Sequence, residues 1–176
     1  MNFGEAIKSV FSKYATFSGR ARRSEYWYFW LFCLLVNIGL GIIPFLGFLS
    51  FLWFLAIFIP TIAVTVRRFH DIGKSGWYYL FIIIPELLFF GYMYYCLFLV
   101  IRDLINSKID FYNIYENIDI VTNSVTANSS SFATLGIFGI IFLAAEILWL
   151  IWMTKDSQPG DNKWGPNPKE LPETKA

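Results

Sequence analysis

A run of 40 residues without a charged side chain, from Trp27 to Val66, constrains this chain more than any other feature. At 1.5 Å per helical residue the run would extend about 60 Å, which is twice the hydrocarbon thickness of a bilayer. One helix cannot use that length inside a membrane. Because Pro44, Gly47 and Ser50 supply turn residues near its middle, the run predicts a helical hairpin that crosses the membrane twice.

Two further apolar runs complete a set of four predicted spans, and each is interrupted by a single glutamate. The chain is 56% apolar and only 15% charged, whereas soluble domains are about one quarter charged. We therefore expect an all-α integral membrane protein with four transmembrane helices, at about 27–43, 51–66, 77–100 and 132–153. The membrane domain would comprise 26–153, with a polar outer loop at 101–131, and 154–176 would form a tail rich in Pro, Gly and Asn.

The distribution of Lys and Arg predicts the orientation, because cytoplasmic loops carry these residues in excess. Residues 1–26 hold five of them and residues 67–76 hold three, whereas the hairpin at 44–50 holds none. The loop at 101–131 holds two against four acidic residues, and the tail holds four lysines. Both termini are therefore expected in the cytoplasm.

The segment before the first span has the pattern of an amphipathic helix. Its apolar residues recur at offsets of three and four: Phe3, Ile7, Val10, Phe11, Tyr14 and Phe17. Residues 1–25 are thus expected to form a helix on the membrane surface, followed by a basic entry motif. Such a helix would either anchor and orient the first span or sense lipids.

Three polar clusters carry the most specific motifs, and all three fall on the predicted cytoplasmic side. They are FSGRARRSEYW at 17–27, RRFHDIGKSGWY at 67–78 and PGDNKWGPNP at 159–168. Together they resemble the bacterial inner-membrane family known as domain of unknown function 805, the YhaH-like proteins. That family has a Gly-Arg-x-x-Arg-x-Glu-Tyr-Trp entry, an Arg-Arg-x-His-Asp-x-x-x-Ser loop and an Asn-x-aromatic-Gly-x-x-Pro tail. The resemblance implies a multi-pass protein of the bacterial plasma membrane and names no activity.

Two interpretations of these clusters remain open. In the first, the arginines pair with acidic residues inside a packed cytoplasmic cap. In the second, the cations bind anionic lipid headgroups or another ligand. The candidate residues are Arg20, Arg22, Arg23, Glu25, Arg67, Arg68, His70, Asp71, Lys74, Ser75, Asn162 and Trp164.

Glu86 and Glu146 lie inside predicted spans, where an ionisable group is costly and is a functional hypothesis by default. Counted from the predicted cytoplasmic ends, they lie about 14 and 11 Å deep, so the two would meet at one level. A facing pair would carry protons or hold a cation. Alternatively, each is neutral and hydrogen-bonds to a neighbouring helix or to backbone freed by Pro85.

Motifs of catalysis and of metal binding do not withstand inspection. Gly73-Lys74-Ser75 lacks the earlier glycine of a phosphate loop, because position 68 is an arginine. His70 is the only histidine, and the two cysteines lie apart in apolar runs. We therefore expect no enzyme, cofactor or metal, and the net charge of +1 gives no support for nucleic-acid binding.

Two classes of function remain. The first is a non-enzymatic scaffold or regulator, whose cap engages membrane lipids, with anionic headgroups favoured, or a partner protein. The second is a small transporter or channel component that uses Glu86 and Glu146. Because four short spans enclose little volume, the second class implies a homo-oligomer or association with another membrane protein.

Overall fold

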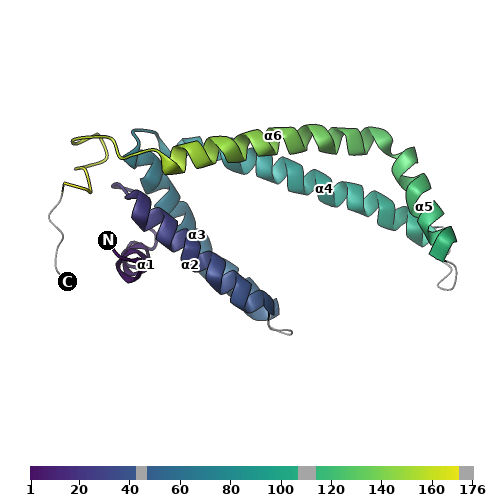
Figure 1. Ribbon diagram of the computed structural model, residues 1–176, viewed down its shortest axis with the longest axis horizontal. Coiled ribbons are helices and arrows are strands. Elements are labelled where there is room, and N and C mark those ends of the chain that lie inside the picture. Colours follow the sequence, from purple (N-terminus) through teal and green to yellow (C-terminus); the bar gives the residue numbers. More distant parts are fainter. Residues whose placement is uncertain (43–46, 107–113, 171–176) are drawn as a thin grey trace. The chain divides into compact units, whose positions relative to one another are not determined.

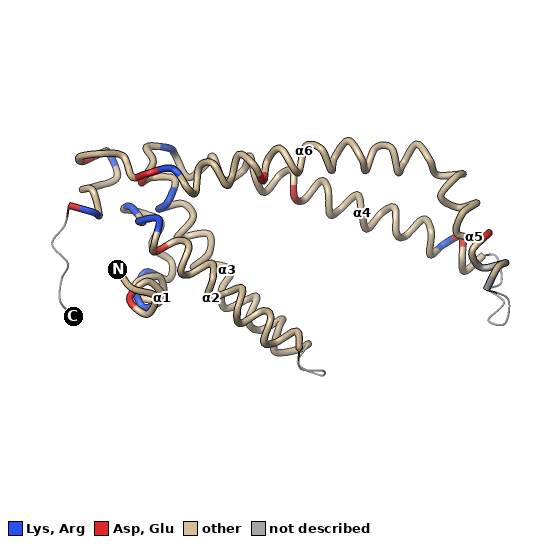
Figure 2. The backbone as a smooth tube through the Cα atoms, viewed as in Figure 1, with Lys and Arg blue, Asp and Glu red and all other residues tan. Residues whose placement is uncertain are grey.

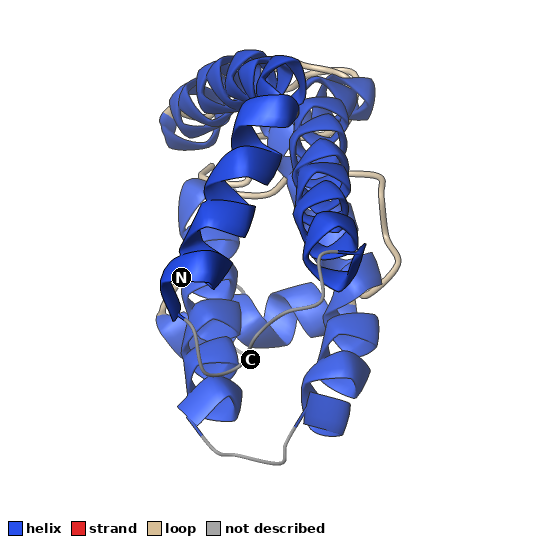
Figure 3. Cartoon of the chain, turned by 90° about the vertical axis from the view of Figure 1, so that its right-hand side faces the viewer, coloured by secondary structure: helices blue, strands red, loops and turns tan. Residues whose placement is uncertain are grey.

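The structure, a computed structural model, describes residues 1–42, 47–106 and 114–170. These residues are mainly helical, and Figure 3 shows helices joined by loops. The elements labelled in Figure 1 are α1 (Phe3–Ser12), α2 (Arg23–Ile42), α3 (Gly47–Asp71), α4 (Leu80–Asn106), α5 (Ile114–Ala127) and α6 (Ser129–Thr154). A short 3₁₀ helix, η1 (Gly76–Tyr79), precedes α4. Four elements, α2, α3, η1 with α4, and α6, are long and apolar enough to cross a membrane, which confirms the predicted four-span helical class.

The chain divides into two compact units. The first unit contains Met1–Tyr79 together with the segment that begins at Trp149, and the second contains Leu80–Leu148. The N-terminal helix, the first two spans and the described tail therefore belong together. All but two of the candidate residues named from the sequence lie in the first unit, and the exceptions are the two glutamates.

In the first unit, α2 and α3 lie side by side, and α1 is drawn end-on beside them in Figure 1. The core between these elements contains Val10 of α1, Phe29 of α2 and Val64 of α3. Phe11 adds an edge-on contact to Phe29, with ring centroids 5.8 Å apart. Because apolar surface gains little by leaving lipid, such packing contacts and polar bonds hold membrane helices together.

Helix α1 begins at a capping box. The side chain of Asn2 accepts a hydrogen bond from the backbone N–H of Glu5 at 2.9 Å, and the Glu5 carboxylate accepts one from the backbone N–H of Asn2 at 2.8 Å. The helix ends at Ser12, so only part of the predicted segment 1–25 is helical before α2 begins. Val10 is buried, as expected for the apolar stripe, whereas Phe3 remains partly exposed. The placement of α1 on a membrane surface stays a prediction.

A proline inside α3 creates a bond between α1 and this span. Pro60 has no backbone N–H, so the carbonyl of Ala56, four residues earlier, has no helical donor. The hydroxyl of Tyr14 donates a hydrogen bond to that carbonyl at 2.6 Å. The segment after α1 therefore satisfies a backbone group that would otherwise be unpaired inside a span.

The predicted boundaries of the first two spans were too short. Helix α2 begins at Arg23 rather than at position 27, and α3 continues to Asp71 rather than ending at position 66. Gly47 and Ser50 belong to α3 and not to a turn, whereas Pro44 lies outside the described residues. Hydropathy marks only the apolar part of a helix, but the backbone hydrogen bonding continues into the polar residues at each end.

The polar segment at 101–131, expected as an outer loop, is helical over most of its described residues. Helix α4 runs on to Asn106, α5 occupies Ile114–Ala127 and α6 begins at Ser129. Asp103 of α4 accepts hydrogen bonds from the Ser124 hydroxyl at 2.6 Å and from the Asn128 amide at 3.3 Å. The polar residues that indicated a loop instead form hydrogen bonds between α4 and the residues that follow it. Such pairing is not visible in a sequence pattern.

Candidate functional site, a buried arginine cluster

Charged residues of the first unit gather at the end where α2 begins and α3 ends (Figure 2). The remainder of the two helices carries none. Five of the gathered side chains are buried and form what we call the arginine cluster: Arg20, Glu25, Arg67, Arg68 and Asp71. Buried charges are costly unless they are paired and hydrogen-bonded, so each partner in this cluster matters.

Asp71, at the last position of α3, is the centre of the cluster and is fully buried. Its Oδ1 accepts a hydrogen bond from Nε of Arg20 at 3.0 Å. Its Oδ2 accepts from Nη1 of Arg68 and from the Ser157 hydroxyl, both at 2.6 Å. One carboxylate therefore joins the segment before α2, the end of α3 and the tail.

Arg20 extends this connection along the tail. Its guanidinium donates hydrogen bonds to the carbonyl oxygens of Gln158 at 2.6 Å and Gly160 at 2.7 Å. The backbone N–H of Gln158 in turn donates to the carbonyl oxygen of Asp71 at 2.8 Å. Gly160 has a φ of 65°, a conformation that favours glycine, and this turn bends the tail around the arginine. Arg20 thus binds a segment of the tail that lies about 140 residues later in the chain.

Arg68 binds carbonyl groups at the C-terminal end of α6 and just beyond it. Its Nε and Nη2 lie 3.3 and 3.2 Å from the carbonyl oxygen of Met153, and Nη2 also donates to that of Lys155. The indole N–H of Trp27 donates to the same Met153 oxygen at 3.2 Å. The last turn of α6 contains no basic residue, so α2 and α3 supply the donors that its C-terminal carbonyls need.

Arg67 connects α3 to the N-terminal segment. Its Nη2 lies 3.5 Å from the carboxylate of Glu25, and its Nη1 donates to the carbonyl oxygens of Lys13 and Thr16. The hydroxyl of Ser9 donates to the same Glu25 carboxylate at 3.1 Å. This second ion pair holds the end of α1 against α2 and α3.

The tail closes over His70 with an aromatic stack. The rings of His70 and Trp164 are nearly parallel, with centroids 4.5 Å apart and 9° between planes. Nδ1 of His70 lies 3.1 Å from the carbonyl oxygen of Gly19, and because a carbonyl only accepts, Nδ1 carries the proton. The Asn162 amide donates to the His70 carbonyl at 2.9 Å. His70 is therefore held from both sides by structural contacts.

Lys74 and Ser75 have local roles at the turn after α3. The Lys74 ammonium lies over the rings of Tyr78 and Trp152, 4.3 and 4.9 Å from their centroids. The Ser75 carbonyl accepts a hydrogen bond from the backbone N–H of Tyr78 at 3.1 Å, which starts η1. Neither residue is bonded to the arginine cluster in the described part of the chain.

Comparisons with known proteins agree with this arrangement of motifs. A family model described as "Protein of unknown function (DUF805)" matches residues 14–166, which include the arginine cluster and its partners in the tail. The chain belongs to the DUF805 family. Inner membrane protein YhaI of Escherichia coli K12 is 42% identical over 82 residues, covering 44% of this chain and 70% of the relative. Inner membrane protein YhaH of the same strain is 35% identical over 85 residues, covering 43% and 70%. No solved structure matches significantly.

These results identify the DUF805 chain as a membrane protein, since its relatives are named inner membrane proteins and four of its helices can span a bilayer. The family description assigns no activity.

Two arginines of the same DUF805 entry motif are not part of the buried cluster. Arg22 donates from Nε to the carbonyl oxygen of Pro168 at 2.6 Å, near the end of the described tail. Arg23 donates to the carbonyl oxygen of Thr154 at 3.2 Å and lies 3.5 Å from the carboxylate of Asp156. With 45% of its side chain exposed, Arg23 remains accessible.

Asp156 attaches the tail in a different way, as an exposed carboxylate. It accepts hydrogen bonds from the Lys169 ammonium and from the backbone N–H of Ser157. These two donors, with Lys169 the stronger influence, hold the pKa of Asp156 below its ordinary value. The carboxylate is therefore ionised at neutral pH and keeps its cationic partners.

In the second unit, the structure brings Glu86 of α4 and Glu146 of α6 together. Both are half-buried, and their carboxyl groups lie close enough to interact electrostatically. Phe89 follows Glu86 by three residues and Phe142 precedes Glu146 by four. Their rings stack with centroids 4.9 Å apart. This DUF805 chain thus carries an acidic pair between two apolar helices.

Several partners in the arginine cluster were missed from the sequence. The Ser157 hydroxyl donates a hydrogen bond to Asp71. The carbonyl oxygen of Met153 accepts from Arg68, and those of Gln158 and Gly160 accept from Arg20. Backbone carbonyls have no residue-type signal, and a lone serine in a polar tail is indistinguishable from its neighbours. Only the return of the tail onto α3 gives them a role.

Proposed function

We propose that this protein is a non-enzymatic scaffold or regulator of the bacterial plasma membrane, with a cap on its cytoplasmic side that engages lipid headgroups or a partner protein. The observation that carries the proposal is Asp71, whose carboxylate joins three segments far apart in sequence at one buried point. The guanidinium groups of Arg20, Arg67 and Arg68 are bonded to acidic groups and backbone carbonyls. Their chemistry therefore supports a packed platform, and its outer surface would contact partners.

The cytoplasmic placement of this cap rests on the excess of Lys and Arg in residues 1–26, in residues 67–76 and in the tail. Labelling of single cysteines in spheroplasts with a membrane-impermeant maleimide tests it. In a background with Cys33 and Cys96 replaced by Ser, Tyr115→Cys should react in intact spheroplasts. Ser75→Cys and Asp161→Cys should react only after lysis, and the reverse pattern would invert the topology.

In-cell photo-crosslinking tests the scaffold role. A photoreactive amino acid replaces exposed Asp161 in the full chain, and crosslinked lipids or proteins are identified by mass spectrometry. We expect a defined product that is lost when D71N disrupts the cap. D103N is the matched control, because it removes a carboxylate that accepts bonds between α4 and α5 instead. Absence of any product, or equal loss in both variants, would contradict the proposal.

A second candidate function is supported by the proximity of the Glu86 and Glu146 carboxyl groups between two apolar helices. Two neighbouring carboxyl groups between apolar helices would serve a small proton or cation carrier. In proteoliposomes loaded with a pH-sensitive dye, the parent should pass protons faster than empty vesicles, and E86Q or E146Q should abolish the difference. D103N should retain it. Flux that is unchanged in the glutamine variants would eliminate the carrier.

A further inference from the structure

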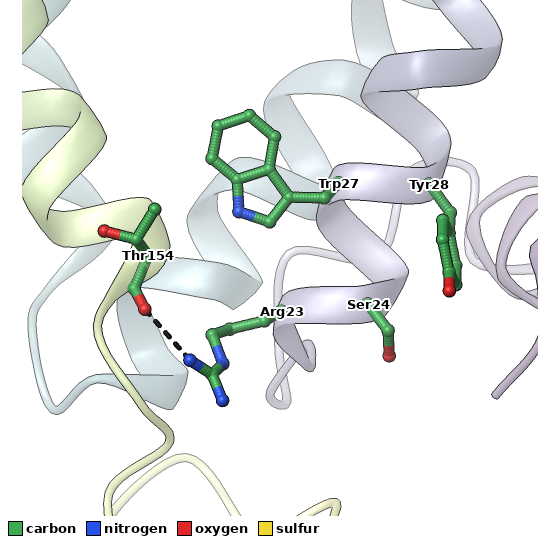
Figure 4. A pocket seen from close by; sticks show the side chains of 5 residues that line it. All are labelled: Arg23, Ser24, Trp27, Tyr28 and Thr154. Atoms are coloured by element: carbon green, nitrogen blue, oxygen red, sulfur yellow. Dashed lines mark hydrogen bonds between the residues drawn. The ribbon is translucent and has the colours of Figure 1, made fainter.

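A pocket of about 340 Å³ lies beside the arginine cluster, within the first unit. Figure 4 shows its lining residues, which are Arg23, Ser24, Trp27, Tyr28 and Thr154. Four of the five come from the first two turns of α2, and Thr154 is the last residue of α6. The pocket therefore opens where a predicted span meets the polar end of the unit.

Arg23 differs from the arginines of the cluster in that its guanidinium is accessible. Its side chain is 45% exposed, compared with 1% for Arg20 and 0% for Arg68. It uses Nη1 for the Thr154 carbonyl, and its Nη2 lies 3.5 Å from the exposed Asp156 carboxylate, whereas its Nε makes no hydrogen bond to any residue that the structure describes. A guanidinium with free N–H groups at a pocket is suited to a phosphate, which it binds through paired hydrogen bonds.

Two hydroxyl groups and an indole ring complete the polar end of the pocket. Among the described residues, the hydroxyls of Ser24 and Tyr28 have no hydrogen-bond partner, so both are available to an anionic ligand. The indole of Trp27 forms one side of the pocket in Figure 4, and its N–H is already bonded to Met153. Tryptophan and tyrosine are enriched at the headgroup level of a membrane.

An exposed apolar stripe continues from the pocket along α2. Its members follow Trp27 at helical offsets of three and four, and all have large exposed apolar surface: Trp30, Leu31, Leu34, Leu35 and Ile38. From Trp27 to Ile38 the stripe extends about 16 Å at 1.5 Å per residue, which is about half of a bilayer core. A ligand with a phosphate at one end and an acyl chain at the other would match both features.

We propose that this pocket binds one anionic phospholipid, with its phosphate on Arg23 and Ser24 and an acyl chain along the stripe on α2. The inference deepens the proposed function, because it rests on the cap facing lipid headgroups and names where one of them binds. It also divides the arginines by role: Arg20, Arg67 and Arg68 hold the fold together, whereas Arg23 contacts the ligand.

Native mass spectrometry of the full chain, released from mixed phosphatidylglycerol and phosphatidylcholine micelles, tests the site. The parent should retain phosphatidylglycerol preferentially. R23Q should lower that preference about five-fold, the factor that corresponds to one basic residue at an anionic leaflet. R102Q is the matched control, because Arg102 has the same 45% exposure and also pairs with an aspartate, yet lies outside the pocket. It should leave the preference unchanged.

Three results would overturn the site: an unchanged preference in R23Q, an equal loss in R102Q, or displacement of the lipid by inorganic phosphate, which would indicate a site for the free anion. If R23Q is recovered poorly, S24A supplies a second test, since it removes one hydroxyl and no charge. The cap is tested separately, because R23Q leaves the bonds to Asp71 in place. A failed lipid site with intact crosslinking from position 161 would refute this inference and leave the proposed function standing.

Discussion

Replacement of Asp71 by asparagine should destabilise the first unit more than any other single conservative change in the cluster. The substitution preserves shape but removes the charge that Arg20 and Arg68 share. It also turns an acceptor into an amide NH₂, which must face either Arg20 Nε on one side or Arg68 Nη1 and the Ser157 hydroxyl on the other. A donor will therefore meet a donor at a site without solvent.

The magnitude follows from burial. Asp71 and Arg68 have 0% exposed side chains and Arg20 has 1%, so water cannot replace the lost partner. Removal of one member of a buried ion pair costs about 3 to 5 kcal/mol. Because Arg20 and Arg68 keep their bonds to carbonyl groups of the tail and α6, we expect a loss of about 3 kcal/mol in the free energy of unfolding.

The assay is equilibrium unfolding in mixed dodecyl sulfate and dodecylmaltoside micelles, followed by tryptophan fluorescence. Trp27, Trp149 and Trp152 pack against the core of the first unit and report its unfolding. D161N is the control, because Asp161 is exposed and the same chemical change there should cost less than about 0.5 kcal/mol. A loss below about 1 kcal/mol for D71N, or equal losses for the two variants, would refute the central role of Asp71.

Two further substitutions test the packing of α3. Y14F removes the hydroxyl that bonds the Ala56 carbonyl, so it should lower the free energy of unfolding by about 1 kcal/mol in the same micelle titration. In a P60A background the same substitution should cause no loss, because the alanine restores a helical donor to that carbonyl. G76A should cost about 1 to 3 kcal/mol, measured as a lowered midpoint of thermal unfolding, because a Cβ there would lie 2.7 Å from a methyl group of Val66.

Each of these two substitutions has a control within the chain. For Y14F the control is the double variant Y14F/P60A. An equal loss of stability in the parent and P60A backgrounds would show that the Tyr14 hydroxyl does not stabilise the protein through the Ala56 carbonyl. For Gly76 it is G136A, since among the described residues no atom beyond the neighbouring backbone of α6 lies within 4 Å of a Cβ at Gly136. If both alanine variants are equally stable, the contact with Val66 does not limit that turn.

The four helical spans could be predicted because apolar length is a property of residue types alone. The same reasoning missed α5, since its Ser, Thr and Asn residues are poor helix formers in isolation. Thr122 and Thr126 bond carbonyls four residues earlier in their own helix, and Ser124 bonds Asp103 of α4. Those partners depend on which helix packs alongside, and this information is absent from local composition.

The candidate residues illustrate the same division. The basic entry motif and the histidine-aspartate motif were identified from their sequence, yet the pattern left open whether their cations are bonded internally or available to ligands. Arg20 and Arg23 are three residues apart, but one is buried against Asp71 and the other is exposed at a pocket. Their different surroundings come from α6 and the tail, more than 125 residues away along the chain.

The sequence by itself determined that this chain has four runs apolar enough to cross a membrane as helices, because the free energy of transfer to lipid is summed over residue types along each run. Only the tertiary structure decided which charges are buried. Burial of a charge depends on partners brought from distant segments, and here the tail's carbonyls and Ser157 complete the coordination of Arg20 and Asp71. That closure separates the arginines that are buried in the fold from Arg23, which stays 45% exposed at a pocket.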